Sequence, residues 1–299
     1  MTFRELIKDG ENLLAAAGIE NAAYDSRRLF EEAFGVSGAR MLLMLENEAG
    51  AELSASVQSY RSLLKRRASR VPLQYITGST CFMGFDFRVS EAVLIPRQDT
   101  ETLVETVLEN EREPEAAVLD MCTGSGCIAV SLKLLGGYRS VTAADKFRNT
   151  LEIAASNAVS LGADIVFVNS DLFDAVEGDF DVIVSNPPYI RKDVIDGLEP
   201  EVRAHEPVAA LDGGCDGLDF YRRITAEAAG GRLKSGGRLY YEIGYDQGQA
   251  VSELLKDNGF ADIRVIKDLA GLDRVVCGTF DGGVSLERNR EDQRYSKTL

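Results

Sequence analysis

The chain contains the tetrapeptide Asn186-Pro187-Pro188-Tyr189, whose residue types suit the methylation of a planar nitrogen. Because the lone pair of an amide or aromatic amine is delocalised, such a nitrogen is a poor nucleophile and must be positioned against the methyl donor. The side-chain oxygen of Asn186 and the carbonyl of Pro187 can accept its N–H groups, while Pro188 stiffens the backbone. The Tyr189 ring can lie against the flat substrate group. We interpret the segment as a catalytic loop that needs no dedicated general base.

A glycine turn is expected upstream of this loop. Residues 118–121 form an apolar strand that runs into the turn 122–126, and Asp145 ends the next strand. A turn of this kind lets a ligand approach bare backbone beside a helix N-terminus, and a carboxylate at the second strand can accept both hydroxyls of a ribose. The same stretch satisfies the G-x-G-x-x-A dinucleotide pattern. NAD, S-adenosylmethionine and a plain tight turn with a capping aspartate all remain open at this point.

The catalytic loop decides between these alternatives. A dehydrogenase has no use for residues 186–189, whereas a nitrogen methyltransferase does, so we expect S-adenosylmethionine as the cofactor. The apolar strand 180–185 leads directly into the loop, which disfavours a simple proline turn. No metal site is expected, because the five cysteines are scattered and His205 is the single histidine.

Short apolar strands that alternate with helices are expected to position both sites. The expected strands lie over residues 118–121, 141–144, 165–168, 181–185 and 239–243, the helices over 128–135 and 149–161, and a closing hairpin over 263–266 and 274–276. This alternation is typical of a mostly parallel sheet with helices on both faces. The predicted fold class is α/β, a Rossmann-like class I S-adenosylmethionine methyltransferase sheet with a small N-terminal helical domain.

The N-terminal part of the chain has helical periodicity. Thr2 and Glu5 form a capping box at the start of the first helix, and Asn21 is expected to cap a second helix that Gly35 closes. Further helices are expected over 41–45 and 53–64. The basic cluster over residues 61–70 is either a solvated helix face or a docking surface for a partner.

Changes of pattern suggest the domain boundaries. Val71-Pro72 breaks the helical periodicity, and alternation over 85–89 predicts a β-hairpin with its turn at Met83-Gly84. We expect a helical domain over 1–71, a β-hairpin linker over 72–95, a catalytic domain over 96–281 and a disordered charged tail over 282–299.

The net charge of -15 disfavours a protein that grips long nucleic acid, because phosphate contacts need a basic surface. No apolar stretch reaches the ~18 residues of a membrane span, and the N-terminus has no signal-peptide pattern. We expect a cytoplasmic, monomeric protein with no stable nucleic-acid or membrane partner.

Other segments, beyond the glycine turn and the catalytic loop, carry a family resemblance. They are Pro72–Gly78, Phe82-Met83-Gly84, Val93–Glu101, Val202–Pro207 and Ala210-Leu211. With these segments, the chain resembles the protein-(glutamine-N5) methyltransferases of translation release factors, the PrmC/HemK family. The tetrapeptide alone is shared with adenine-N6 DNA methyltransferases, so the alternative is a methyltransferase acting on a nucleobase amine. A cofactor-binding module without catalysis is a third hypothesis.

The resemblance implies a substrate and a set of contacts. The substrate is the glutamine of the Gly-Gly-Gln motif in bacterial class I release factors, methylated at its amide nitrogen, and the helical domain helps to recognise the factor. Substrate contacts fall on Asn186, Pro187, Pro188 and Tyr189. Cofactor contacts fall on Cys122, Thr123, Gly124, Ser125, Gly126, Asp145, Leu172 and Asn186.

The chain departs from the family pattern at two cofactor positions. The family usually has glycine at the position of Cys122 and often an aromatic residue at that of Leu172, so we expect these departures to affect cofactor affinity rather than reaction type. Two smaller clusters keep two interpretations each. Arg97, Thr100 and Glu101 either start a helix, or Arg97 or Thr100 reaches the cofactor's amino-acid end. His205 and Glu206 either brace the catalytic loop or lie at the surface.

Overall fold

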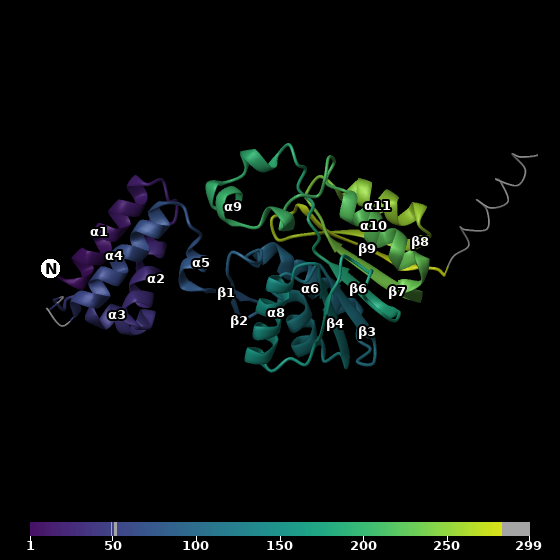
Figure 1. Ribbon diagram of the computed structural model, residues 1–299, viewed down its shortest axis with the longest axis horizontal. Helices are drawn as coiled ribbons and strands as arrows, with labels where there is room; N and C mark the ends of the chain where they lie inside the picture. The colour runs from purple at the N-terminus through teal and green to yellow at the C-terminus, as the bar shows by residue number, and fades with distance from the viewer. Residues whose placement is uncertain (49, 51–52, 283–299) are drawn as a thin grey trace, which may run out of the picture. The chain divides into compact units, whose positions relative to one another are not determined.

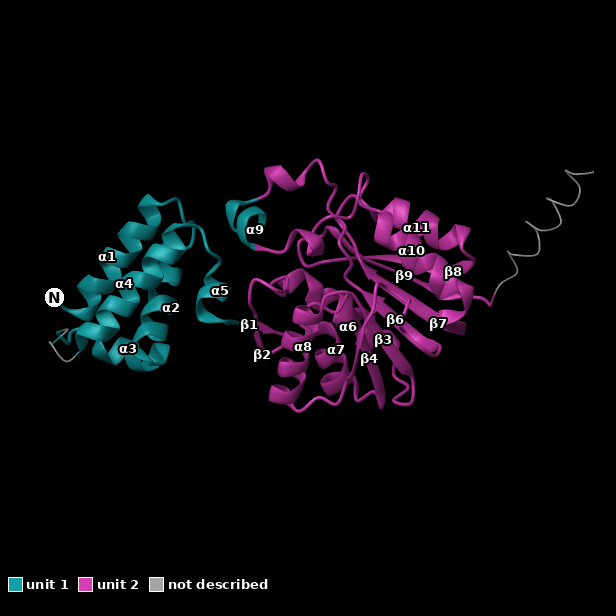
Figure 2. Ribbon diagram, viewed as in Figure 1, with its two compact units in different colours: residues 1–79, 199–205 teal, residues 80–198, 206–299 magenta. Residues whose placement is uncertain are grey.

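The computed structural model describes residues 1–48, 50 and 53–282, which form two compact units (Figure 2). Unit 1 comprises residues 1–79 together with 199–205, and unit 2 comprises 80–198 and the chain from residue 206 onward. The tail expected to be disordered lies outside the described residues, apart from Gly282. Within these described ranges, no helix is both long and apolar enough to cross a membrane.

Unit 1 is helical, as expected. Its helices are α1 (Phe3–Ala16), α2 (Ala22–Phe34), α3 (Gly38–Met44), α4 (Ser54–Ala68), α5 (Leu73–Thr77) and α9 (Pro200–His205). The capping box at α1 is confirmed: the Glu5 amide donates to Thr2 Oγ1 at 3.2 Å, and the Thr2 amide donates to Glu5 Oε2 at 2.9 Å. The expected capping by Asn21 is wrong, because its backbone is not extended and its side chain makes no capping hydrogen bond. Gly35 closes α2 in the left-handed conformation, as expected.

The core of unit 1 combines aromatic packing with one buried polar contact. Phe30 stacks on Phe34 with ring centroids 4.1 Å apart and meets Tyr60 edge-on at 5.7 Å. The hydroxyl groups of Ser26 and Tyr60 lie 2.7 Å apart, and Ser26 also donates to the Ile7 carbonyl. These contacts join α1, α2 and α4, which explains why the helical segments form a single unit.

Two arginines of the basic cluster form ion pairs within unit 1, so they belong neither to a solvated face nor to a docking surface. Arg67 is buried and donates to Asp25 at 2.6 Å and to Glu201 at 3.0 Å, while Arg70 donates to the other Glu201 oxygen at 3.0 Å. Although burial alone would raise the pKa of Glu201, a backbone hydrogen bond and both arginines hold it below its usual value. These pairs attach α9 to α4, two helices that are far apart in the sequence.

Unit 2 is built on a seven-stranded sheet in the order β5-β4-β3-β6-β7-β9-β8, in which β9 runs antiparallel to its neighbours (Figure 1). Its strands are β3 (Ala117–Met121), β4 (Ser140–Asp145), β5 (Val166–Asn169), β6 (Phe180–Ser185), β7 (Leu233–Glu242), β8 (Phe260–Lys267) and β9 (Asp273–Phe280). The predicted mostly parallel α/β sheet is confirmed. The last three strands are longer than expected, because β7 extends back to Leu233 and the closing hairpin spans most of residues 260–280.

Side chains of the central strands alternate between two hydrophobic layers. Val118, Val182 and Val184 pack on one face, and Leu119 and Ile183 pack on the other. Helices α6, α7 and α8 cover the first face, whereas α10 and α11 cover the second (Figure 2). Their bounds are α6 (Glu101–Asn110), α7 (Cys127–Ser131), α8 (Arg148–Leu161), α10 (Asp219–Glu227) and α11 (Gly248–Asp257). The helical stretch expected over 128–135 is present: α7 continues directly into a π-helical segment over Leu132–Gly136.

The predicted hairpin is present as β1 (Ser79–Phe82) and β2 (Phe85–Arg88). Met83 and Gly84 both have positive φ, of 50° and 80°, which is the geometry of a tight two-residue turn. Asn157 of α8 accepts from the Arg88 amide at 2.8 Å and donates to the Arg88 carbonyl at 3.0 Å. The same side chain donates to the Ser125 carbonyl, so β2 is joined through α8 to the glycine turn.

Candidate active site

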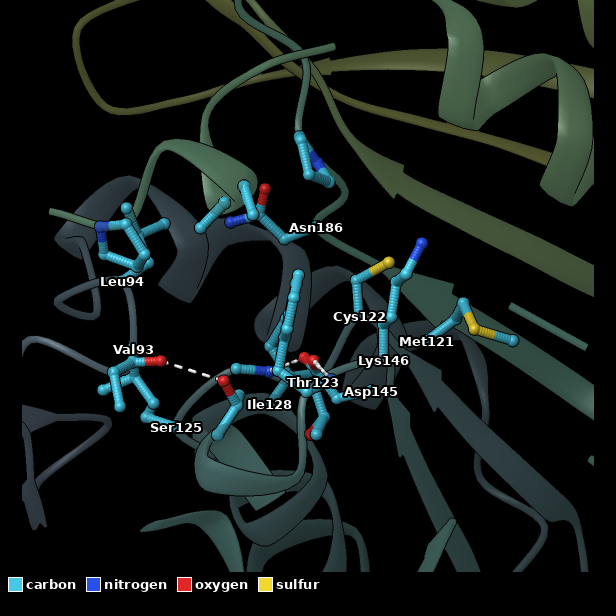
Figure 3. Close-up of a pocket in the computed structure, with 18 of the residues that line it drawn as sticks. Val93, Leu94, Met121, Cys122, Thr123, Ser125, Ile128, Asp145, Lys146 and Asn186 are labelled. Carbon is cyan, nitrogen blue, oxygen red and sulfur yellow. Dashed lines mark hydrogen bonds between the residues drawn. The ribbon is translucent and has the colours of Figure 1, made fainter. Parts of the chain in front are cut away.

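A cavity of about 440 Å³ lies in unit 2 at the carboxyl ends of the parallel strands. This is where open α/β sheets bind ligands, and the volume is that of a small-molecule site. Figure 3 shows Asn186 across the cavity from Thr123 and Ser125 of the glycine turn. Among the residues expected at the site, those that line the cavity are Cys122, Thr123, Gly124, Ser125, Asp145, Leu172, Asn186 and Pro188. Gly126, Pro187 and Tyr189 adjoin it in the chain without lining it.

The glycine turn needs its two glycines for different reasons. Gly124 and Gly126 both have positive φ, of 55° and 81°, which favours glycine. A Cβ on Gly126 would lie 3.1 Å from that of Ala154 in α8, so this position also allows close packing of the turn on a helix. A Cβ on Gly124 would meet no protein atom within 4 Å, which leaves bare backbone at the cavity wall.

A buried carboxylate behind the turn holds its shape. Asp120 accepts from the Thr123 hydroxyl at 2.6 Å and from the Ala129 amide at 3.0 Å. Burial raises the pKa of Asp120 to about 7, against the lowering effect of these two hydrogen bonds. The residue ties the strand, the turn and the first turn of α7 together from the side away from solvent.

Asp145 occupies the position expected of a ribose acceptor. It ends β4, lines the cavity and accepts from the Gly124 amide at 3.1 Å and from the Phe147 amide at 3.0 Å. Burial raises its pKa, and the backbone hydrogen bonds from Phe147 and Gly124 oppose the rise. Since each carboxylate oxygen has two lone pairs, both retain capacity to accept from a ligand.

Two residues that line the cavity have a strained backbone. Cys122 and Leu172 have φ values of 64° and 51°, in the left-handed region that a side chain disfavours, and both line the cavity. Such strain costs roughly 1–3 kcal/mol a residue and is typical of functional sites. A left-handed backbone at position 122 gives a physical reason for the glycine expected there.

The catalytic loop is held against glycine backbone. A Cβ on Gly213 would lie 2.7 Å from the Tyr189 Cα and 2.8 Å from the Pro188 carbonyl oxygen, so this position must be small. The Gln247 side chain donates to the Tyr189 carbonyl at 3.1 Å. At the start of the loop, the Ser185 hydroxyl donates to the Met121 carbonyl at 2.6 Å. Contacts within the protein therefore hold the loop along its whole length.

The two polar side chains of the loop have different surroundings. Asn186 lines the cavity and donates through Nδ2 to the Thr100 hydroxyl at 3.3 Å. Tyr189 instead packs against the second hydrophobic layer and directs its hydroxyl to Glu242 Oε1 at 3.3 Å. Burial raises the pKa of Tyr189 well above its usual value, so the phenol stays protonated.

Some residues of the two smaller predicted clusters line the cavity, and others support neighbouring structure. Arg97 and Thr100 line the cavity, and Thr100 also ends the turn that precedes α6. Glu206 is buried rather than at the surface, and both of its oxygens accept from Arg97, at 2.6 and 2.7 Å. Burial raises the pKa of Glu206, while Arg97 lowers it. Glu101 accepts from the Met83 amide at 2.6 Å, so it serves the hairpin turn.

Two family models match this chain. The PrmC N-terminal domain matches residues 5–78, and the methyltransferase small domain matches residues 97–198. The release factor glutamine methyltransferase of Geobacter sulfurreducens is 42% identical over 280 residues, which cover 93% of this chain and 96% of the relative. That of Cereibacter sphaeroides is 44% identical, over 88% of this chain and 93% of the relative.

This chain belongs to the release factor glutamine methyltransferase family. The resemblance inferred from the sequence is confirmed, and the chain is a methyltransferase. A methyltransferase structure from Pyrococcus furiosus has a TM-score of 0.51 at 19% identity, covering 76% of this chain and all of that one. At that identity the likeness supports the methyltransferase fold alone.

In this member of the release factor glutamine methyltransferase family, several residues at or behind the site were missed by the sequence patterns. Lys146 and Phe147 directly follow Asp145 and line the cavity, and their position after a carboxylate expected to accept from a ribose was the available signal. Glu242 is the last residue of β7 and lies behind the loop. A glutamate at the carboxyl end of an apolar strand was the signal in its case, because ligands bind at that edge.

Proposed function

We propose that this enzyme transfers a methyl group from S-adenosylmethionine to the side-chain amide nitrogen of a glutamine in a bacterial class I release factor, within its Gly-Gly-Gln motif. One observation carries the proposal: in a chain of this family, Asn186 faces the glycine turn and Asp145 across a single cavity. A methyl donor on one wall and an amide acceptor on the other would meet in that space.

The residues of the cavity fit the proposed cofactor. The bare backbone at Gly124 and the carboxylate of Asp145 suit a nucleoside, with Asp145 accepting from the ribose hydroxyls. Leu172 and Ile128 provide apolar contact, and Leu172 offers less stacking area than an aromatic residue would. When bound, S-adenosylmethionine supplies an electrophilic methyl group on a sulfonium. The chain's own residues bind, orient and exclude water around that group.

The loop residues would position the substrate amide. The Asn186 side-chain oxygen and the Pro187 carbonyl accept its two N–H groups, which turns the nitrogen lone pair toward the methyl group. Proline at 187 and 188 keeps this backbone rigid and free of competing donors. No side chain of the loop is available as a general base, since Tyr189 is a protonated phenol, and the amide proton leaves to solvent after transfer.

The remaining parts of the proposal concern recognition. We assign residues 1–71 to release-factor recognition, 72–95 to the linker and 96–281 to catalysis. The net charge of -15 supports a protein substrate over a long nucleic acid. We propose a cytoplasmic, monomeric enzyme.

Methyl transfer with purified components tests this function. The enzyme, labelled S-adenosylmethionine and a bacterial release factor should give labelled factor, and replacing the Gly-Gly-Gln glutamine in the factor should abolish the label. Asn186→Ala should lower kcat by on the order of 100-fold, because it removes a positioned acceptor. Label that enters DNA or RNA instead of the release factor would refute the proposal in favour of a nucleobase methyltransferase.

A further inference from the structure

Two buried side chains outside the catalytic loop hold its two ends. Glu242, only 1% exposed, accepts from the Tyr189 hydroxyl at the end of the loop. The hydroxyl of Thr100, which is 2% exposed, accepts from Asn186 at the start of the loop. Each polar side chain of the loop is thus bonded to a buried residue that does not belong to the loop.

The direction of these hydrogen bonds decides what Asn186 presents to the cavity. An asparagine amide has two donor hydrogens on Nδ2 and one acceptor oxygen, which lie on opposite sides of the group. Because Nδ2 is bonded to Thr100, the oxygen is free to face elsewhere. The reverse orientation would bond the oxygen to the threonine hydroxyl and turn two N–H donors toward the substrate amide. Methyl transfer to that amide needs the acceptor.

Burial of Thr100 supports this orientation. Its hydroxyl is 2% exposed, so water competes little for the oxygen that accepts from Asn186.

We propose that Thr100 is a positioning residue of the methyl-transfer reaction: it fixes the Asn186 amide with its oxygen toward the cavity. This inference rests on the proposed function for the reaction but concerns the orientation of a side chain that exists in the free enzyme. Thr100 touches neither reacting atom in this account and acts through Asn186.

Paired substitutions test the assignment. Thr100→Val removes the hydroxyl at nearly constant volume and should lower kcat by on the order of 10- to 100-fold, because the amide loses its fixed orientation. Thr100→Ser keeps the hydroxyl and should stay within about threefold of the parent. Thr106→Val is the matched control, since it deletes another buried threonine hydroxyl six residues further on, in α6, bonded to the Thr102 carbonyl. Its kcat should be unchanged.

Coupling to Asn186 separates positioning from a structural role. In an Asn186→Ala background, Thr100→Val should lower kcat by less than about threefold further, because the residue it acts through is already gone. Thr100→Ala offers a second variant if Thr100→Val fails to fold: it also deletes the hydroxyl and should lower kcat as well. The assignment would be overturned if the kcat loss of the double variant equalled the product of the two single losses. It would also be overturned if Thr106→Val lowered kcat as much as Thr100→Val does.

A readout without turnover keeps this inference distinct from the proposed function. The side-chain amide resonances of Asn186, assigned by their loss in Asn186→Ala, should show one protected hydrogen in the parent and in Thr100→Ser. That protection should disappear in Thr100→Val. If it survives there, the orientation argument is wrong even when the parent methylates release factor. If the parent does not methylate release factor, the proposed function fails, and the resonances still decide the orientation.

Discussion

Replacing Glu242 by glutamine should change how the stability of the protein depends on pH. Glu242 is fully buried, and burial raises its pKa from 4.5 to about 7, against the lowering effects of Thr100, Arg274 and Tyr189. Between those two pH values the folded protein holds a proton that the unfolded chain has lost. That difference stabilises the folded state at low pH and is lost as the pH rises through 7.

The expected size of the effect follows from the two pKa values. With 4.5 for the unfolded chain and about 7 for the folded protein, raising the pH from about 5.5 to about 8 removes on the order of 2 kcal/mol of unfolding free energy. Glu242→Gln cannot titrate, so it should be more stable relative to the parent at the higher pH by that amount. All other groups contribute equally to both proteins and cancel.

Urea unfolding, followed by circular dichroism at several pH values, measures this difference. Glu201→Gln is the matched control: its pKa is held below the usual value by a backbone hydrogen bond, Arg67 and Arg70, against burial, so it is ionised in both states over this range. Its stability profile should run nearly parallel to that of the parent. A Glu242→Gln profile parallel to the parent over the same range would show that the buried carboxylate does not hold its proton, and would refute the reasoning.

Two glycine pairs give further predictions. Gly126→Ala should lose about 2–3 kcal/mol of unfolding free energy, from its positive φ and its contact with Ala154, whereas Gly124→Ala should lose about 1 kcal/mol from positive φ alone. Equal losses in urea unfolding would exclude the contact. Gly213→Ala should lower kcat at least about tenfold, because its Cβ would displace the catalytic loop, while Gly197→Ala, whose Cβ meets nothing within 4 Å, should keep the parent's kcat. Equal kcat values would show that the loop tolerates the displacement.

Sequence patterns could predict the cavity because its residues lie at the ends of strands. Apolar runs place Asp145 at the end of β4 and Asn186 directly after β6, and parallel strands bring their carboxyl ends to one edge of the sheet. The glycine turn follows the strand β3 and can be predicted in the same way. All these positions depend on backbone topology, and the periodicity of apolar residues predicts that topology.

The supporting contacts could not be predicted in this way. Arg97 and Glu206 are 109 residues apart, Arg67 and Glu201 are 134 apart, and each pair could equally have been solvated. Whether such side chains meet depends on the packing of elements that are remote in the sequence. The missing side-chain cap at Asn21 has a local cause, since its backbone is not extended. Residue type alone does not specify that conformation.

The position of the added methyl group tests the central claim most directly. A bacterial class I release factor, incubated with this enzyme and S-adenosylmethionine, should gain one methyl group, and fragmentation mass spectrometry should place it on the side-chain nitrogen of the Gly-Gly-Gln glutamine. The Asn186→Ala enzyme should leave the same peptide largely unmodified. An unmodified glutamine after prolonged incubation with the parent enzyme at saturating cofactor, or a methyl group on another residue, would contradict the account.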